Sequence, residues 1–546
     1  MDNQKLIALF ANSFKQNWEL PVFSDYQGET YTYGDAAQLI RNIHCFFRES
    51  GIAKGDKVAL FGRNASNWGI TFIAVVSYGA VAVPVLPDFN PDDVHHIINH
   101  SEAKILFGND LLLEKIEHEK LPGIQAILSL VNFRLLFARS EKLEENAGKC
   151  FDIAFSGKVN PLNFELNELE NEDLCIISYT SGTSGFTKGV MLPVRSILSN
   201  IIFAQEHMPL KAGDKIVSFL PMAHVFGLLF EFLFPVTMGC HITFLTKAPT
   251  PQIITQAFSE VRPRLILSVP LVIEKIYRKR IQPTLDKPAM KVLMAIPGIS
   301  SVLRKKVKAK LTETFGGRFF EIVIGGAPLS RDVETFFRKI KFPFTIGYGM
   351  TECGPLISYD SWKTTQFTSA GKLVDRMEVK IDSEDPYKAV GEILVRGENV
   401  MMGYYKNEEA TRATIDDDGW LHTGDLGIID PNNYIFIRGR SKNMLLGPSG
   451  QNIYPEELED KLTNQPYVAE CVVVEREKKL VALVYPDKES VQAASLTEEQ
   501  LMAAMNENRH RVNKELPRYE HISRIELVDC EFEKTPKKNI KRFLYA

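Results

Sequence analysis

Residues Tyr179–Val190 (YTSGTSGFTKGV) combine hydroxyl side chains, glycines and a lysine, as a phosphate-binding loop requires. Gly182 and Gly185 let backbone N–H groups approach an anion closely, and Lys188 adds a positive charge. The hydroxyl groups that can donate hydrogen bonds to phosphate are those of Thr180, Ser181, Thr183 and Ser184. Lys188 has neither a glycine directly before it nor a serine or threonine directly after it, so this is not a Walker A loop and a P-loop kinase is disfavoured. A flexible Ser/Gly turn is the alternative interpretation.

Six further motifs follow this loop in a defined order: Phe219–Gly227 (FLPMAHVFG), Gly325–Leu329 (GGAPL), Gly347–Glu352 (GYGMTE), Trp420–Asp425 (WLHTGD), Gly439–Met444 (GRSKNM) and Asn452–Glu459 (NIYPEELE). In order and spacing, the set resembles the acyl-adenylate-forming superfamily of acyl-CoA synthetases, peptide-synthetase adenylation domains and luciferases. The resemblance covers essentially the whole chain. Segments 55–68, 84–106 and 441–459 resemble the long-chain fatty acyl-CoA ligase branch in particular.

The resemblance implies a nucleotide site built from several of these motifs. Thr351 and Glu352 are implied to bind the α-phosphate and Mg²⁺, and a hydroxyl and a hard carboxylate oxygen suit those ligands. Tyr348 is implied to stack on adenine, against a flat wall formed by Gly325, Gly326 and Ala327.

The resemblance also assigns residues to the ribose and to a domain hinge. Asp425 is implied to accept both ribose hydroxyls, because a carboxylate can accept from two donors. Arg440 is implied to reach the ribose and phosphates, and Lys442 to lie at the hinge about which a small domain turns. Gly447–Gly450 resembles the segment that lines the pantetheine tunnel after that rotation.

An acyl pocket is implied by the motif that contains His224. This histidine matches a position that lines the acyl site and gates access to it, and Gly349 is expected to line the same site. The apolar segment 225–234 behind His224 would form the wall of an acyl tunnel. A histidine among apolar neighbours can instead be a hydrogen-bonded core residue, and an apolar run can be ordinary core.

Two other features carry less chemistry than their residue types suggest. His96 and His100 have the spacing of a two-histidine metal site, but no third ligand is evident, so we interpret them as surface or interface residues. Cys353 follows Glu352 directly, yet the family needs no cysteine nucleophile.

Near its C-terminus the chain departs from the family pattern. Residues 533–542 read EKTPKKNIKR, and aligning this stretch with the family places Asn539 where the adenylating lysine belongs. An amide cannot supply positive charge to the developing transition state, and loss of such a contact typically costs about 10²–10³ in rate. Lys537 and Lys541 are expected on the side of Asn539 in an extended loop, whereas a bulge of one residue would present Lys538. The alternative is that these lysines are solvated and that adenylation is slow.

The hydrophobic pattern predicts the secondary-structure elements that would position these residues. Short apolar runs at 58–62, 81–86, 175–180, 215–220, 265–269 and 320–326 alternate with longer helical patterns, which predicts α/β layers. Residues 370–440 show short alternating strands and predict a small antiparallel or β-barrel-like unit. The segment 225–245 contains Glu231, Pro235 and Gly239, and predicts a buried helix, a break and a buried strand. We therefore expect a large N-terminal domain, residues 1–440, and a small mobile C-terminal α/β domain, residues 441–546.

Composition is that of an ordinary globular protein. Of 546 residues, 45% are hydrophobic and 24% are charged, and the net charge of −4 gives no basic surplus for nucleic acid. Seven scattered cysteines without a CxxC pair favour a reducing compartment, and the N-terminus shows no signal peptide, so we expect a cytoplasmic protein. Peripheral membrane contact and oligomeric state stay open.

The function expected from the resemblance is activation of a medium- or long-chain fatty acid with MgATP, followed by transfer to CoA. Activation forms acyl-AMP, a mixed anhydride from which AMP is a good leaving group. A free carboxylate has no such leaving group. Three alternatives stay open: transfer to a carrier-protein phosphopantetheine, an ATP- and acyl-binding homologue impaired by Asn539, and, least favoured, a transmembrane acyl transporter.

Overall fold

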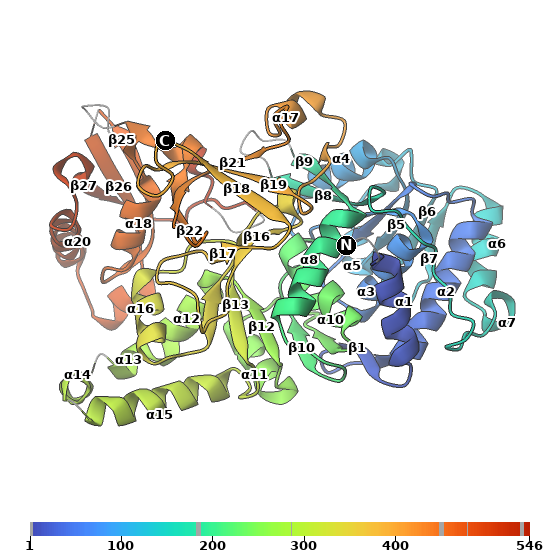
Figure 1. Cartoon of the computed structure of the whole chain (residues 1–546), viewed down its shortest axis with the longest axis horizontal. Coiled ribbons are helices and arrows are strands. Elements are labelled where there is room, and N and C mark those ends of the chain that lie inside the picture. The colour runs from blue at the N-terminus through green and yellow to red at the C-terminus, as the bar shows by residue number, and fades with distance from the viewer. Residues whose placement is uncertain are drawn as a thin grey trace.

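The computed structural model describes residues 4–181, 187–285, 287–296, 298–446, 452–477, 479–535 and 540–545 (Figure 1). It is an α/β structure in which several sheets are flanked by helices (Figure 1). The chain opens with α1, Leu6–Gln16.

An eight-stranded sheet carries the first predicted motif. Its strand order is β20-β9-β8-β4-β3-β5-β6-β7, and β8, β4, β3, β5 and β6 run parallel. The strands are β3 Lys57–Phe61, β4 Val81–Val85, β5 Ala103–Gly108, β6 Ala126–Ser129, β7 Leu135–Ala138, β8 Leu174–Ser181, β9 Thr187–Pro193 and β20 Gly403–Tyr404. The buried apolar runs predicted at 58–62, 81–86 and 175–180 are therefore strands of one sheet.

Helices cover this sheet because its strands are apolar on both faces. They include α3, which is buried along nearly its whole length. Their bounds are α2 Tyr33–Glu49, α3 Ser66–Tyr78, α4 Pro91–Ser101, α5 Asp110–Leu113, α6 Glu141–Cys150, α7 Ile153–Ser156 and α8 Val194–His207.

Two smaller sheets follow, with orders β10-β11-β1-β2 and β12-β13-β14. Their strands are β1 Pro21–Asp25, β2 Thr30–Thr32, β10 Lys215–Ser218, β11 His241–Phe244, β12 Leu265–Ser268, β13 Glu321–Ile324 and β14 Phe344–Ile346. The strands predicted at 215–220, 265–269 and 320–326 are confirmed. The helices of this part are α11 Pro251–Val261, α12 Pro270–Arg280, α13 Gln282–Leu285, α14 Pro288–Ala295, α15 Ile299–Thr314 and α16 Arg331–Lys339.

The long apolar segment 225–245 folds as predicted into buried helix, break and strand. It comprises α9 (Val225–Gly227), a π-helical turn (Leu228–Leu233), α10 (Phe234–Thr237) and then β11. Gly239, with φ of +76°, makes the break between α10 and β11. Among the described residues, no helix has both the length and the apolar character needed to cross a bilayer.

The predicted antiparallel unit lies between residues 348 and 440. A sheet ordered β18-β19-β21-β22 and a sheet ordered β15-β16-β17 are joined by a bridge between Lys372 and Tyr434. The bounds are β15 Tyr348–Gly349, β16 Leu356–Tyr359, β17 Lys372–Leu373, β18 Met377–Asp382, β19 Gly391–Gly397, α17 Glu408–Arg412, β21 Leu421–Ile429 and β22 Ile435–Arg440.

The C-terminal hundred or so residues form a small α/β unit with hydrophobic clusters of their own. A three-stranded sheet, β25-β26-β27, packs against helices α18 and α20 (Figure 1). The elements are β23 Leu445–Leu446, β24 Asn452–Ile453, α18 Pro455–Thr463, β25 Val468–Arg476, β26 Lys479–Pro486, α19 Lys488–Ala493, α20 Glu498–Asn513 and β27 Ile522–Leu527. The domain boundary at residue 440 stays a prediction.

Candidate active site

One cleft, of about 3350 Å³, brings together predicted residues from across the sequence. It runs between the large N-terminal part of the chain and the C-terminal unit, whose α18 and β25 also line it. The predicted residues that line it are Thr180, Lys188, His224, Gly325, Gly326, Ala327, Tyr348, Gly349, Thr351, Glu352, Asp425, Arg440 and Lys442.

The structure does not describe the remaining predicted residues, or describes only their backbone. The backbone of Ser181 ends β8, but its side chain is not described. Gly182, Thr183, Ser184 and Gly185 lie outside the described residues, as do Lys538, Asn539 and the Gly447–Gly450 segment.

The Ser/Gly-rich loop connects two strands of a hairpin. β8 and β9 are antiparallel, with Thr180 opposite Lys188 and Ser181 opposite Thr187. Cross-strand pairing therefore places the Thr180 hydroxyl and the Lys188 ammonium group at the same end of the sheet. The Lys188 Nζ lies 4.7 Å from the ring centroid of Tyr404, close enough for a cation–π contact.

Tyr404 is a residue that the sequence analysis missed. It lies on β20, which pairs with β9 so that Tyr404 is opposite Val190. Its hydroxyl donates a hydrogen bond of 2.9 Å to Oε1 of Glu352. Burial and the neighbouring Glu352 carboxylate raise the pKa of Tyr404, so the phenol stays protonated and remains a donor. Tyr404 therefore links Lys188 to Glu352 through one aromatic ring.

Glu352 has the chemistry of a Mg²⁺ ligand. Its side chain is half-buried in the cleft wall, and the backbone carbonyl accepts a hydrogen bond of 2.8 Å from the Met401 N–H. Carboxylate oxygens held by an outer hydrogen-bond partner are typical Mg²⁺ ligands, and Tyr404 supplies that partner. The residues present therefore fit the predicted metal.

A hydrogen-bonded network joins three predicted nucleotide-binding residues, of which Tyr348 and Asp425 are buried and Arg440 is exposed. Asp425 and Arg440 are opposite each other on β21 and β22, and Arg440 Nε lies 2.8 Å from Asp425 Oδ1. The Tyr348 hydroxyl donates a 2.7 Å hydrogen bond to Asp425 Oδ2. Asp425 is 4% exposed. Burial raises the pKa of its carboxyl group, while Arg440 and Tyr348 oppose that rise.

Asp425 thus presents two hydrogen-bonded carboxylate oxygens to the cleft. Each oxygen has a second acceptor position, which two ribose hydroxyls would use. Glu392 was also missed by the sequence analysis: its Oε1 accepts from the Gly424 N–H at 2.9 Å, and its Oε2 lies 2.9 Å from His422 Nδ1. Glu392 therefore holds strand β21 just before Asp425, where Gly424 has φ of +70°.

Two glycines of the predicted site are closely packed, and Gly349 has no room for a side chain. A Cβ atom on Gly349 would lie 2.1 Å from the carbonyl oxygen of Pro355, and one on Gly325 would lie 3.2 Å from the Phe226 ring. Gly326 has φ of +87°, which other residues rarely adopt. The close packing of Gly325 against Phe226 joins the predicted adenine wall to the predicted acyl pocket.

His224 is half-buried and precedes α9 at the edge of the cleft. Two missed residues hold the segment before it. Oε2 of the buried Glu231 accepts from the N–H groups of Phe219 and Leu220, each at 2.9 Å. Asn64 accepts from the Met222 N–H at 3.0 Å and donates to the Leu220 carbonyl at 2.7 Å.

The predicted hinge lies in a short 3₁₀ turn, Ser441–Asn443. Lys442 is exposed there. Ser441 Oγ donates to the Gly424 carbonyl at 3.2 Å, and Asn443 Nδ2 donates to Glu456 Oε1 at 2.6 Å. The turn is therefore tied on one side to the Asp425 strand and on the other to α18.

The described residues on the two sides of Asn539 pair with each other. Lys534 bridges Ile540 in antiparallel fashion. Lys541 Nζ lies 3.2 Å from Glu533 Oε2, and Lys534 Nζ lies 2.5 Å from Glu470 Oε1. Arg542 anchors the base of this segment through two bonds to the Glu459 carboxylate, at 2.5 and 2.7 Å. Lys534 and Lys541, on the two sides of the residues that the structure does not describe, both line the cleft.

Two side features have structural explanations. His100 Nδ1 lies 2.7 Å from the Tyr179 hydroxyl, and its ring also packs edge-on against Tyr405. His100 is therefore half-buried between two tyrosines, whereas His96 is exposed. Cys353 is buried, and burial raises the pKa of its thiol well above the usual value, so it is held as the unreactive thiol.

The sequence matches known protein families and characterised relatives. The family described as AMP-binding enzyme matches residues 10–405, and its C-terminal domain family matches residues 443–545. Long-chain-fatty-acid–CoA ligase FadD15 of Mycobacterium bovis is 26% identical over 559 aligned positions, covering 94% of this chain and 90% of that protein. 4-coumarate–CoA ligase 3 of Arabidopsis thaliana is 26% identical, covering 82% of this chain and 75% of that protein.

The fold is shared with solved structures. A crystal structure of the anthranilate CoA ligase AuaEII with anthranoyl-AMP superposes with a TM-score of 0.79 at 19% identity, covering 99% of this chain and 96% of that chain. Because the family match spans most of the sequence, the chain belongs to the AMP-binding enzymes, the adenylate-forming acyl-CoA ligases.

Proposed function

We propose that this protein is an AMP-forming fatty acid–CoA ligase for medium- and long-chain acids. In the first step a carboxylate oxygen attacks the α-phosphorus of ATP, forming acyl-AMP and releasing pyrophosphate. In the second step the CoA thiol attacks the acyl carbonyl, forming the thioester and releasing AMP. The scattered cysteines are all free thiols, which supports the cytoplasm as its compartment.

The observation that carries the fatty-acid proposal is the apolar wall of the cleft beyond His224. This wall starts at Phe226, against Gly325, and continues to Leu271 on α12. Its apolar members are Val225, Phe226, Phe230, Leu267, Val269, Leu271, Val272 and Val323. A wall of aliphatic and aromatic side chains suits an alkyl chain, which gains free energy from every methylene removed from water. The long-chain ligase relative supports the same class of acid.

The proposed chemistry assigns binding tasks to the residues in the cleft. Thr180 and Lys188 face the phosphates from the β8–β9 hairpin, and Thr351 binds the α-phosphate. Asp425 orients the ribose, and Tyr348 lies under the base. Mg²⁺ held by Glu352 would neutralise phosphate charge when bound. These contacts orient the α-phosphorus toward the carboxylate, and such positioning supplies much of the rate in phosphoryl chemistry.

For adenylation we propose that Lys537 or Lys538 supplies the cation in place of Asn539. Lys541 and Lys534 are already paired with glutamates, as described above. Substituting Lys537 and Lys538 singly by alanine identifies the cation, because only one loss should slow acyl-AMP formation by about 10²–10³. An unchanged rate in both variants, with a gain in Asn539→Lys, would favour the adenylation-impaired alternative.

The test of the proposed function is a competition among acids. The purified protein is incubated with MgATP, CoA and equimolar acids from acetate to octadecanoate, together with 4-coumarate and anthranilate, and the thioesters are identified by mass spectrometry. We expect CoA thioesters of the medium and long alkyl acids to dominate.

Two controls make the competition decisive. Asp425→Ala should abolish every product if the nucleotide lies where we propose. Replacing CoA by a phosphopantetheinylated carrier protein tests the other acceptor. Preferential use of 4-coumarate or anthranilate would contradict the fatty-acid proposal, and acyl transfer to the carrier protein alone would contradict CoA as acceptor.

A further inference from the structure

Helices α14 and α15 form a face whose chemistry the proposed reaction does not use. They lie along the lower edge of the molecule, with α14 at its outer corner (Figure 1). Among the described residues of α15, Leu311 near the C-terminal end is the buried one. The two helices are therefore supported at one end and expose much of their length.

Large apolar side chains are exposed on this face. Val292 is 62% exposed and Val302 is 55% exposed. The others on these two helices and the connection between them are Leu293, Ile296 and Ile299. Such residues cost free energy in water, and a contiguous exposed group of them indicates a contact surface.

The same segment is strongly basic. Residues 287–312 contain no aspartate or glutamate. The cations in this stretch are Lys287, Lys291, Arg304, Lys305, Lys306, Lys308 and Lys310. In a chain with a net charge of −4, this is a concentrated positive region.

One stripe of α15 is apolar in its first half and basic in its second half. Ile299, Val302, Lys306 and Lys310 follow one another at spacings of three and four residues, so they share a helix face. All four are exposed. The opposite side of the helix faces the protein: Val307 packs against the core, and Lys308 Nζ lies 5.8 Å from the Trp362 ring.

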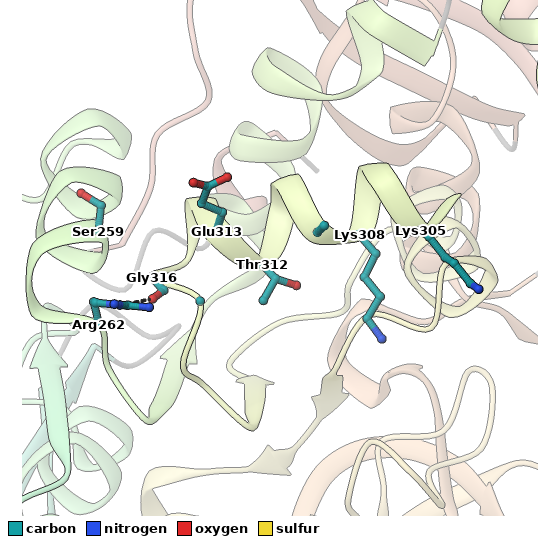
Figure 2. A pocket seen from close by; sticks show the side chains of 9 residues that line it. Ser259, Arg262, Lys305, Lys308, Thr312, Glu313 and Gly316 are labelled. Carbon is teal, nitrogen blue, oxygen red and sulfur yellow. Dashed lines mark hydrogen bonds between the residues drawn. The ribbon is translucent and has the colours of Figure 1, made fainter. Parts of the chain in front are cut away.

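A hollow of about 720 Å³ is lined by the C-terminal half of α15 and the C-terminal end of α11. Arg262, at one end of this hollow, donates a 3.0 Å hydrogen bond to the Gly316 carbonyl, whereas Lys305 and Lys308 extend from α15 at the other end (Figure 2). Protein contacts therefore leave the outer stripe of α15 uncovered.

We propose that the outer face of α14 and α15 docks on the surface of an anionic lipid bilayer. Lysines at this face match the negative headgroups, and the neighbouring valine and isoleucine side chains enter the acyl boundary, as in other interfacial helices. A nucleic acid would satisfy the lysines but would leave the apolar residues exposed to water. The combination of both residue types therefore favours lipid.

The position of this face fits delivery of a fatty acid, a link that rests on the proposed function. The apolar cleft extends to Leu271 and Lys275 of α12 and to Gln282 of α13, and α13 packs against α14. An acid that partitions into the bilayer would thus be close to the opening of the cleft. Docking itself does not require that the protein be a fatty acid ligase.

Vesicle co-sedimentation of the full chain tests docking without any enzyme assay. The probes are vesicles of phosphatidylcholine alone and vesicles that also contain phosphatidylglycerol, at about 0.1 M salt. We expect sedimentation with the anionic vesicles only. The double variant Lys306→Glu/Lys310→Glu should lower the partition constant at least about tenfold, and Ile299→Ser/Val302→Ser should lower it without changing charge.

A matched variant controls for net charge. Lys142→Glu/Lys514→Glu makes the same charge change at exposed lysines elsewhere and should bind like the unmodified protein. Circular dichroism and ATP binding report whether each variant folds. The proposal is overturned if the protein does not sediment with anionic vesicles, if the α15 variants bind as well as the control, or if a single-stranded oligonucleotide is retained at this salt while vesicles are not.

Activity separates this proposal from the proposed function. Use of hexadecanoate supplied in anionic vesicles should fall in Lys306→Glu/Lys310→Glu, while use of dissolved octanoate should be unchanged. Vesicle binding without thioester formation would contradict the ligase proposal but not the docking proposal. Thioester formation without vesicle binding would contradict the docking proposal but not the ligase proposal.

Discussion

At the scale of single residues, Tyr404 connects parts of the site that come from three distant segments. Its hydroxyl group bonds to Glu352, and its ring lies beside Lys188. The sequence suggested Lys188 and Glu352 separately, because each lies in a recognisable motif. Tyr404 has no such signal, since its position depends on a two-residue strand pairing with β9 across more than two hundred positions.

Tyr404→Phe tests whether this hydroxyl positions Glu352. The ring and its contact with Lys188 remain, but the hydrogen bond to the carboxylate is lost. Removing an outer partner of a metal ligand typically costs about 10- to 100-fold in metal affinity or activity, so we expect a lower kcat and a higher Mg²⁺ requirement. Steady-state rates across a Mg²⁺ titration measure both quantities.

Tyr405→Phe is the matched control, because the Tyr405 hydroxyl bonds to the exposed Glu102 instead, at 2.8 Å. It should leave the rate and the Mg²⁺ requirement unchanged. Equal Mg²⁺ dependence in Tyr404→Phe and the unmodified protein would show that Tyr404 does not position the metal ligand.

Glu231 allows a second residue-scale prediction. Burial raises the pKa of its carboxyl group well above the usual value, which favours the protonated form, and a protonated carboxyl group resembles an amide in charge and shape. Glu231→Gln should therefore change the free energy of unfolding by less than about 1 kcal/mol, whereas Glu231→Ala leaves two buried N–H groups without their acceptor and should cost about 2–4 kcal/mol.

Denaturant unfolding checks the stabilities of both Glu231 variants, and the KM for the acid reports on the segment before His224. We expect KM to rise in Glu231→Ala alone. A glutamine variant as unstable as the alanine variant would show that a charged carboxylate is required there.

At the scale of elements, the strands that form the sheets were predictable because they are continuous apolar runs. The β8–β9 hairpin and β13 each place a predicted motif at a strand end, which local sequence already indicates. The π-helical turn was not predictable, because all its residues are buried and, apart from Glu231, apolar, so they carry no periodic signal. The Lys534–Ile540 bridge likewise depends on pairing that an alternation rule does not reveal.

Strand β13 carries a group that should make stability depend on pH. Glu321 is buried, accepts from Tyr359 Oη and the Trp362 N–H at 2.5 Å each, and has its pKa raised by burial to about 7. A raised carboxyl pKa means that the folded state binds the proton more tightly than the unfolded state. The stabilisation is therefore full below about pH 4.5 and is lost as the pH rises through about 7, a change of about 3 kcal/mol.

Glu321→Gln removes this titration. The unmodified protein should lose more of its thermal midpoint than the variant between about pH 5.5 and about pH 8. Melting curves of both proteins at the two pH values check the difference. A variant with the same pH dependence as the unmodified protein would show that Glu321 ionises normally.

At the scale of the whole molecule, the order of motifs along the chain identified the family before any geometry was known. The cleft that unites those motifs could not be predicted from pattern alone, because it is formed by the C-terminal unit lying opposite Asp425 and Lys188. Arg331 Nε lies 3.6 Å from Asp460 Oδ2, and Arg278 Nη2 donates to the Thr463 carbonyl at 3.1 Å, across this cleft. These few polar contacts suit an interface that changes during the reaction.

Lys442→Pro tests whether the C-terminal unit rotates about Lys442, as the family resemblance implies. Proline fixes φ near −65°, which the first turn of a helix accepts but which prevents large backbone rotation. We expect acyl-AMP formation to continue and thioester formation to fall by about tenfold or more. Single-turnover measurements of the two steps separate them, and Lys442→Ala should retain the second step. Equal loss of both steps in Lys442→Pro would contradict the hinge.

Activation of fatty acids as acyl-AMP is tested most directly by acid-dependent exchange of labelled pyrophosphate into ATP, measured without CoA. This exchange reports the reversal of acyl-AMP formation and requires nothing of the second step. We expect exchange with dodecanoate or hexadecanoate, little exchange with 4-coumarate, and none in Asp425→Ala. Exchange that is absent with every fatty acid, while ATP still binds, would contradict the claim that this cleft activates fatty acids.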